Sequence, residues 1–155
     1  MSLSAIREQI KVILAGVAGI GVIHDYERWA ADYGTLMNLF KDSEGRINAC
    51  IFAQKKRQEK YVVMGAPDKN RVFGITFIMG LKDSEATGIL FEDLLERAVD
   101  AFRGNDDLNG ACLTCSPEWG EVADLSGLQI GLIEPRMFGG VLCHYAEAIL
   151  GVVER

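Results

Sequence analysis

Hydrophobic residues near the start of the chain recur with the spacing of one face of an α-helix. This period of three to four positions is shared by Ile6, Ile10, Ile13, Leu14 and Val17. A serine at position 2 or 4 can cap the first turn, and the glycines at positions 16, 19 and 21 end the pattern. The chain is therefore predicted to open with an amphipathic helix.

Extended structure is predicted for the middle of the chain. Residues 22–29 form a candidate strand, and residues 47–54 and 72–81 are rich in Ile, Phe, Val and Thr, which favour strands. The last of these has the composition of a central strand. Residues 33–40 are apolar but match neither a helical nor an alternating period, so they stay unassigned.

A charged segment and a turn signal lie between these strands. Residues 55–60 have the composition of a charged turn or bulge, and residues 61–64 resume extended structure. Residues 67–70 read Pro-Asp-Lys-Asn, which predicts a turn because Pro fixes φ while Asp and Asn tolerate turn geometry.

A second amphipathic helix follows. We expect Asp83 or Ser84 to open it, with Glu85 in its first turn near the positive end of the helix dipole. Gly104 closes this helix. One stripe holds its apolar residues, Phe91, Leu94, Leu95, Ala98 and Phe102.

The last part of the chain is predicted to be a β-hairpin. Residues 105–127 form a looser segment, long for a simple connection. Residues 128–137 and 141–153 have the pattern of two strands, joined at Phe138-Gly139-Gly140.

This order of helix, strands, helix and hairpin predicts an α+β fold, a mainly antiparallel β-sheet with two helices packed on one face. We expect one domain over residues 1–155. The other face of the sheet would stay uncovered and available to another subunit.

Charge and hydropathy narrow the function classes. The 155-residue chain has 22 acidic and 16 basic residues and a net charge of −6, which disfavours specific nucleic-acid binding through phosphates. The apolar run at residues 10–23 is too short and too glycine-rich to span a bilayer. We therefore expect no membrane association and a location in the compartment of synthesis.

The cysteines are the first candidates for chemistry. Cys112 and Cys115 form a C-x-x-C pair, and Cys143 precedes His144, so a four-ligand zinc site can be drawn. Neighbouring residues on a strand point to opposite faces, however, and the C-x-x-C pair does not open a helix as a redox motif does. Buried inert thiols are favoured, without a cofactor or metal. The alternative is a small thiol- or metal-dependent enzyme, or a ligand-binding module, that uses this region.

Other catalytic signals are weak. His24 and Asp25 are adjacent and diverge on a strand, so they do not form a catalytic set. The sequence has no nucleophile elbow and no phosphate-cradling glycine loop. We therefore expect no enzymatic activity.

Two segments are candidates for partner binding. The first is the charged run with Lys55, Lys56, Arg57 and Lys60, which is either a solvated loop or a docking loop for an acidic partner or for DNA phosphate. The second is residues 134–140, where Arg136 and Phe138 have the composition of protein interfaces. Its alternative is a turn with a hydrophobic residue packed beneath it.

The order of elements carries a family resemblance. A first helix, several strands, a second helix opened by Asp83-Ser84-Glu85 and a terminal hairpin resemble the tail terminator and tail completion proteins of long-tailed bacteriophages. Residues 22–29 (VIHDYERW) and 136–145 (RMFGGVLCHY) are also similar to segments of prophage proteins from tail gene clusters.

The resemblance implies a structural role. Members of this family form a ring, commonly a hexamer, that caps the tail tube and contacts the head–tail connector. Such a homo-oligomer would meet the tail tube protein and the connector while DNA passes through its channel. It would be found in the host cytoplasm during assembly and afterwards in the virion tail.

Overall fold

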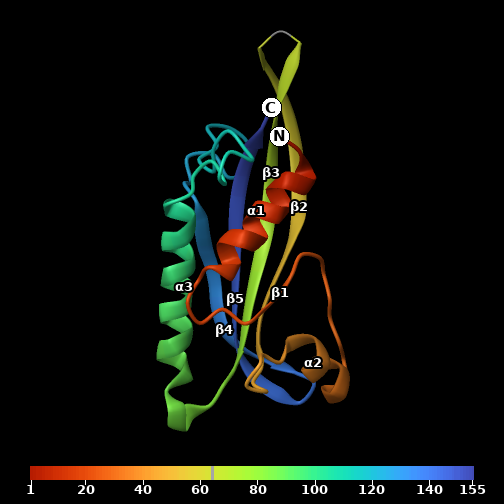
Figure 1. The fold of residues 1–155 in the computed structure, drawn as a ribbon, viewed down its shortest axis with the longest axis vertical. Coiled ribbons are helices and arrows are strands. Elements are labelled where there is room, and N and C mark those ends of the chain that lie inside the picture. Colours follow the sequence, from red (N-terminus) through yellow and green to blue (C-terminus); the bar gives the residue numbers. More distant parts are fainter. Residues whose placement is uncertain (64) are drawn as a thin grey trace.

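A five-stranded, mostly antiparallel sheet forms the middle of the molecule (Figure 1). The computed structural model describes the backbone of residues 1–63 and 65–155, and all of their side chains except those of residues 62 and 63. The strand order is β1-β2-β3-β5-β4, and β1 alone pairs in parallel. The bounds are β1 Val22–His24, β2 Asn48–Val63, β3 Ala66–Gly80, β4 Leu128–Phe138 and β5 Val141–Glu154. The predicted α+β class is confirmed.

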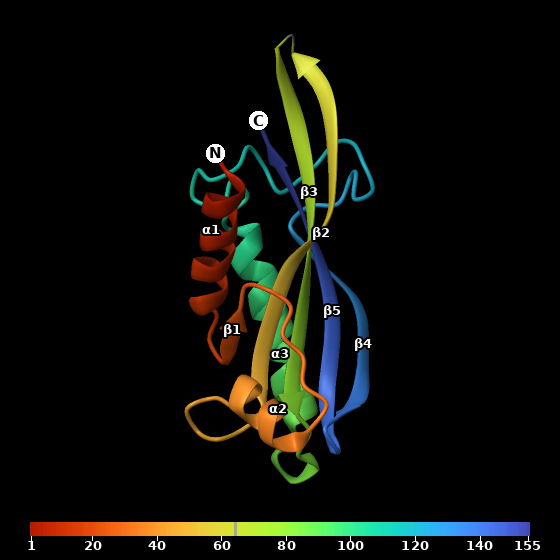
Figure 2. The same cartoon turned by 90° about the vertical axis from the view of Figure 1, so that its right-hand side faces the viewer.

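Two helices cover one face of the sheet, as the apolar stripes predict (Figure 2). Helix α1 spans Leu3–Ala15, and the Ser2 side chain caps it by accepting a hydrogen bond from the Ala5 amide at 3.1 Å. Helix α3 spans Thr87–Arg103. Both stripes pack on buried strand residues that include Cys50, Phe52, Phe73, Ile75, Phe77, Ala148 and Leu150. Within the described residues, no helix is long and apolar enough to cross a membrane.

The second of these helices begins later than the sequence predicts. Asp83–Glu85 forms one turn of 3-10 helix, and Ala86 adopts a left-handed conformation with φ of 51° before α3 starts at Thr87. The left-handed residue interrupts the helical path, so Glu85 lies outside the first turn of α3. The Thr87 hydroxyl accepts a hydrogen bond from the Lys82 amide at 2.9 Å and so ties the two turns together.

The other face of the sheet is partly covered, which corrects the prediction of an uncovered face. The unassigned segment forms helix α2, Tyr33–Phe40, capped by the Asp32 carboxylate. Its Leu36 and Phe40 pack with strand residues in a second buried cluster. The predicted strand at residues 22–29 also ends early, at His24. The chain then leaves the sheet to reach α2.

A long β2–β3 hairpin replaces the turn predicted at residues 67–70, and the run at residues 55–60, predicted as a charged turn or bulge, belongs to β2 beside a bulge. Strand β2 continues through the charged run with a bulge between Gln54 and Lys56, and β3 already begins at Ala66. Opposite charges face each other across the hairpin, such as Lys60 with Asp68. Such pairs favour the extended register over a local turn. Val63 pairs with Ala66, so the chain reverses there, and Met64 of the predicted segment 61–64 lies outside the described residues.

The C-terminal hairpin is confirmed. Strands β4 and β5 pair from Leu128 with Leu150 to Phe138 with Val141. Gly139 and Gly140 turn the chain with φ of 54° and 81°, the positive values that tight hairpin turns need. The long segment at residues 105–127 contains no helix and no strand. Thr114 within it forms a single bridge with Val153 at the end of β5.

One glycine permits the parallel pairing of β1 with β2. A Cβ atom at Gly21 would lie 1.9 Å from the carbonyl oxygen of Asn48. We expect Gly21→Ala to lower the free energy of unfolding by about 1–3 kcal/mol, because backbone has to move to admit the methyl group. Urea unfolding measures this change. Gly16→Ala is the matched control, because its added Cβ would meet nothing closer than 3.5 Å; equal losses in the two variants would contradict the prediction.

Candidate interaction surfaces

The distal part of the β2–β3 hairpin forms an arm that projects beyond the helices (Figures 1 and 2). We use the name arm for the paired residues from Gln54 to Phe73. Strand β5 supports the arm as far as Glu154, which pairs with Lys69. The end of the arm has only β2 and β3. Because an isolated two-stranded hairpin is marginally stable in water, the arm depends on what braces its base.

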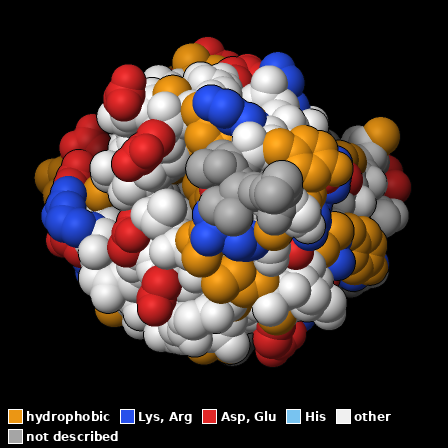
Figure 3. Space-filling view, turned by 90° about the horizontal axis from the view of Figure 1, so that it is seen from above, with side chains coloured by type: hydrophobic (Ala, Val, Ile, Leu, Met, Phe, Trp, Pro, Cys, Tyr) orange, Lys and Arg blue, Asp and Glu red, His pale blue; other side chains and the backbone are white. Residues whose placement is uncertain are grey.

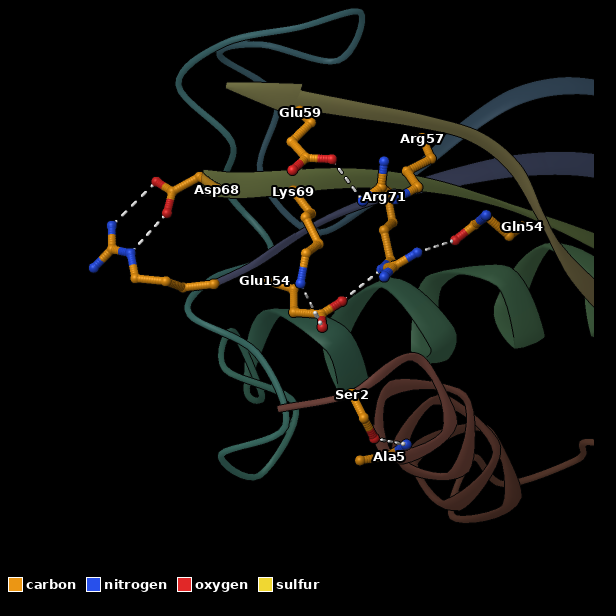
Figure 4. Close-up of polar contacts among 10 residues, drawn as sticks. Ser2, Ala5, Gln54, Arg57, Glu59, Asp68, Lys69, Arg71 and Glu154 are labelled. Carbon is orange, nitrogen blue, oxygen red and sulfur yellow. Dashed lines mark hydrogen bonds and ion pairs between the residues drawn. The ribbon is translucent and has the colours of Figure 1, made fainter. Parts of the chain in front are cut away.

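A buried ion pair lies at that base (Figure 4). The Arg71 guanidinium donates to the Glu154 carboxylate at 2.6 Å, and their side chains are only 9% and 5% exposed. Arg71 also donates to the Gln54 side chain at 2.9 Å, and Lys69 lies 3.5 Å from Glu154. The network therefore joins β2, β3 and β5. Next to it, Arg155 forms a two-point contact with Asp68 at 2.8 and 3.1 Å.

The ionisation of Glu154 is coupled to folding. Burial alone raises the pKa of a carboxyl group, but the hydrogen bond and charge of Arg71, together with Lys69, outweigh it, so the pKa of Glu154 lies below its ordinary value. A carboxylate with a lowered pKa stabilises the fold above its unfolded pKa, and that stabilisation disappears as pH falls through the folded pKa. The arm is therefore held most firmly near neutral pH.

The segment at residues 105–127 braces the opposite face of the arm. The Asn70 side chain donates to the Trp119 carbonyl at 2.6 Å, and the Gln58 side chain accepts from the Glu121 amide at 3.2 Å. Gly120 has a φ of 90°, and a Cβ there would lie 2.7 Å from Asn70. The close approach of this loop to both strands explains its length, because it has to pass around the end of β5 to reach them.

The charged run on β2 is largely neutralised within the chain. Lys55 pairs with Glu27, Lys56 with Glu121, and Arg57 with Glu59 at 2.7 Å. These pairs are partly exposed, so each contributes little stability. Among the described residues, Lys60 has no ion-pair partner.

The tip of the arm is apolar. Residues 61–67, which we call the tip, contain no charged side chain. Tyr61 is 73% exposed, and Pro67 lies opposite it on β3. Seen from above, basic and hydrophobic side chains surround the end of the arm (Figure 3). Acidic side chains gather on the side where α3 lies.

The β4–β5 hairpin sorts its residues onto two faces. Arg136 lies over the Tyr145 ring at 4.0 Å and pairs with Glu134 at 2.5 Å. Phe138 stacks on Trp29 with ring centroids 5.9 Å apart and contacts Tyr145 at 5.8 Å. Both side chains thus have partners inside the chain. For Phe138 the structure agrees with the packed-turn alternative.

The intervening residues of β4 point the other way and are exposed. Ile133 and Met137 are 54% and 63% exposed, and Pro135 between them is also exposed. Met137 lies opposite Leu142, whose carbonyl accepts a hydrogen bond from the Leu81 amide. These neighbours form one surface, the apolar strip, made of Leu81, Ile133, Pro135, Met137 and Leu142. Contiguous exposed apolar surface of this kind marks interaction sites.

Cys112 and Cys115 lie together, but Cys143 lies apart from them. Cys112 and Cys115 belong to the buried cluster beneath α1 and α3, while Cys143 lies in the cluster on the other face. The hydrogen bond with Cys112 and burial raise the pKa of Cys115, and burial raises the pKa of Cys143 to about 11. Among the described residues, no group of three or more His, Cys, Asp and Glu side chains is placed to hold a metal ion.

The histidines have structural partners. His24 lies 2.7 Å from the Leu39 carbonyl, while the adjacent Asp25 pairs with Lys11 at 3.7 Å, so the two diverge. His144 lies 2.9 Å from the Thr87 hydroxyl and stacks on Phe91. Burial lowers the pKa of His144. Each imidazole therefore ties a helix to the sheet.

A shallow hollow lies beside residues 105–127, the region proposed for a small ligand. Its volume is about 340 Å³, at the small end of the range for ligand sites. Its walls are formed by Asp68, Leu113, Thr114, Ser116, Glu118, Trp119 and Val153. Several polar groups there already bond within the chain: the Thr114 and Ser116 hydroxyls both donate to Asp106.

Comparison with known proteins adds no family to this geometry. No protein-family model and no curated protein matches the chain. The structure itself points to two surfaces that are open to a partner, the arm and the apolar strip. Sequence reasoning found the arm by its charges but missed Tyr61, Ile133 and Met137. The alternating direction of side chains along β4 could have indicated that Ile133 and Met137 share one face.

Removing the charge of Glu154 tests the bracing of the arm. We expect Glu154→Gln to lower the free energy of unfolding at pH 7 by about 3 kcal/mol, because Arg71 then stays buried without a counter-charge. The difference from the unmodified protein should shrink as pH falls from the ordinary pKa of 4.5 through the lower pKa that Glu154 has in the fold. Urea unfolding between pH 3 and pH 7, about the useful range for carboxylates, measures it.

Asp100→Asn is the matched control for this experiment. Asp100 pairs with Arg103 at 2.5 Å, but both side chains are more than half exposed, at 64% and 72%. Its loss should cost less than about 1 kcal/mol. A loss at Glu154 that is as small as that at Asp100, or independent of pH, would contradict the role of the ion pair.

Neighbouring substitutions on β4 separate packing from partner binding. We expect Phe138→Ala to lower the free energy of unfolding by about 1–3 kcal/mol, less than for a fully buried Phe, since its ring is half-buried against Trp29 and Tyr145. Met137→Ala should change it by less than about 0.5 kcal/mol, because Met137 is exposed. Thermal and urea unfolding of the two variants provide the measurement, and the reverse ranking would show that the faces are misassigned.

Proposed function

We propose that this chain is a structural assembly protein of a phage tail. It forms a homo-oligomeric ring, hexameric by analogy with the family it resembles, that caps the tail tube and joins it to the head–tail connector. It acts through protein contacts in place of catalysis. The location that follows is the host cytoplasm during assembly and the virion tail afterwards.

The observation that carries this proposal is the presence of two different exposed apolar surfaces on one subunit. The tip of the arm and the apolar strip lie at opposite ends of β3, which runs from Ala66 to Gly80. A closed ring of identical subunits needs two unlike patches, because each subunit meets one neighbour on each side. A two-fold dimer would need only one self-complementary patch.

The construction of the arm also supports an assembly role. The ion pair of Arg71 with Glu154 and the contacts of Asn70 with the 105–127 segment fix its direction. A contact presented on a rigid element loses less conformational freedom on binding. The arm can therefore act as a positioned contact between subunits.

The charge distribution suits a channel for DNA. The chain has 22 acidic against 16 basic residues and a net charge of −6. Carboxylates repel the phosphate backbone, so a lumen bordered by them lets DNA slide without being held. The proposal therefore includes passage of DNA without sequence-specific binding.

Solution mass tests the ring. We expect light scattering coupled to size exclusion to give one discrete oligomer, or a monomer that converts to it as concentration rises. Electron microscopy of the same fraction should show closed rings. A strict monomer at every concentration, or open filaments alone, would contradict the proposal.

The proposal places the gene of this chain in a tail gene cluster, so its deletion tests the tail function. Deletion of its gene should yield tails without a fixed length, because tube growth is no longer capped. Tails of normal length on complete particles would contradict the terminator role even if the protein forms rings. An expressed copy of the gene serves as the control and should restore the length.

A further inference from the structure

We infer that the tip of the arm of one copy docks onto the apolar strip of the next copy. This inference rests on the proposed ring and names the surfaces that build it. The occupant of the strip is thus a second copy of this chain, and the contact is head-to-tail.

The strip has the properties of one half of such a contact. Met137 and Ile133 stand two strand repeats apart on β4, and Leu142 faces Met137 across the hairpin. The exposed fractions of these three side chains are 63%, 54% and 42%. The β4 residues that point to the opposite face, such as Phe138, pack against other parts of the chain. The exposure is therefore a property of one face and not of a loosely packed hairpin.

The tip has matching chemistry. Its described side chains, Tyr61, Ala66 and Pro67, carry no charge, and Tyr61 is 73% exposed. Tyrosine is enriched at the centres of protein interfaces, since it contributes a large contact area with few rotatable bonds. Met137 in the strip is a suitable counterpart, because its flexible thioether adapts to an aromatic ring.

The contact is made through side chains and not by adding a strand to β4. Pro135 lies in the middle of that edge strand and has no amide hydrogen to donate to a new neighbour. Glu134 and Arg136 flank it and pair with each other. Proline and charges on an edge oppose strand addition, whereas the apolar side chains on one face remain available for packing.

Charge complementarity favours a second copy as the partner. Lys60 borders the tip, while α3, which packs against β4, carries exposed Glu92, Asp93 and Glu96. When the tip covers the strip, a cation near the tip meets the acidic side of α3. Figure 3 shows the basic side chains near the end of the arm. Opposite charges around an apolar centre fix the orientation of a contact.

The two surfaces cannot meet within one chain. Through Ala146, Ile133 of the strip is level with Phe77 on β3, ten residues from Pro67 of the tip, which at the usual rise corresponds to about 33 Å. The tip and the β4–β5 turn lie at opposite ends of the molecule (Figure 1). The contact therefore has to be intermolecular, and it leaves a free tip and a free strip at the two ends of any open chain of subunits until the ring closes.

Cysteine cross-linking tests the contact. The four native cysteines are buried, so a bismaleimide reagent should react chiefly with introduced thiols. We expect the double variant Tyr61→Cys/Met137→Cys to give a covalent ladder that ends at the mass of the ring. A mixture of the two single variants should stop at dimers, because each subunit then has one introduced thiol. Either single variant alone should give no cross-link.

A matched control places the second thiol elsewhere. Val12 is exposed by 49% on α1, far from the strip, so Tyr61→Cys/Val12→Cys should give no ladder. Rings that form normally while the Tyr61→Cys/Met137→Cys variant gives no ladder would overturn this inference and leave the ring intact. Dimers from Tyr61→Cys alone would also overturn it, because they require a symmetric contact. A protein that is monomeric throughout would overturn the proposed function as well.

A charged substitution supplies a second readout. Met137→Asp should raise the concentration at which rings dissociate by about tenfold or more, as expected for a residue at the centre of a contact. Light scattering over a dilution series measures it, with the far-ultraviolet spectrum checking that the variant is folded. An unchanged midpoint in a folded variant would remove the strip from the ring contact.

Discussion

The arm depends on the buried ion pair of Arg71 with Glu154. A hairpin as long as β2–β3 gains little stability from its own two strands. Glu154 lies at the last described pairing of β5, so the carboxylate joins the third strand to the arm just where that support ends. A buried charge without a partner is costly, which means that the base of the arm is ordered only when all three strands are in register.

This bracing lets the rest of the molecule leave apolar surface exposed. The helices α1 and α3 bury one face of the sheet, and α2 with the aromatic stack of Trp29, Phe138 and Tyr145 covers part of the other. The core is thus complete without the tip or the apolar strip. Exposed side chains that no core requires are best explained by a partner.

The sequence predicts those elements whose signals are local and periodic. The stripes of α1 and α3 and the Gly139-Gly140 turn need only their own residues, so their positions are correct. Residues 67–70 have the local chemistry of a turn but form part of β3, because β5 and the 105–127 segment supply partners that are distant in sequence. The charged run at residues 55–60 keeps a bulge, as its composition allowed, but continues as a strand. Helix α2 has only eight residues, too few to show a period. The strip was missed because its residues come from β4, β5 and the residue that follows β3, and only the folded chain brings them together.

Both edges of the sheet carry residues that prevent another strand from pairing with them. This agrees with a specific side-chain contact between copies. Pro135 and the pair of Glu134 with Arg136 protect the edge of β4, and the paired lysines of the arm protect the edge of β2. Strand addition at either edge could continue without limit, whereas docking of one tip on one strip occupies both surfaces. A chain whose sheet edges are protected against strand addition, and which exposes two unlike apolar patches, can therefore assemble to a defined size. For a protein that ends the growth of a tube, a self-limiting contact is the required property.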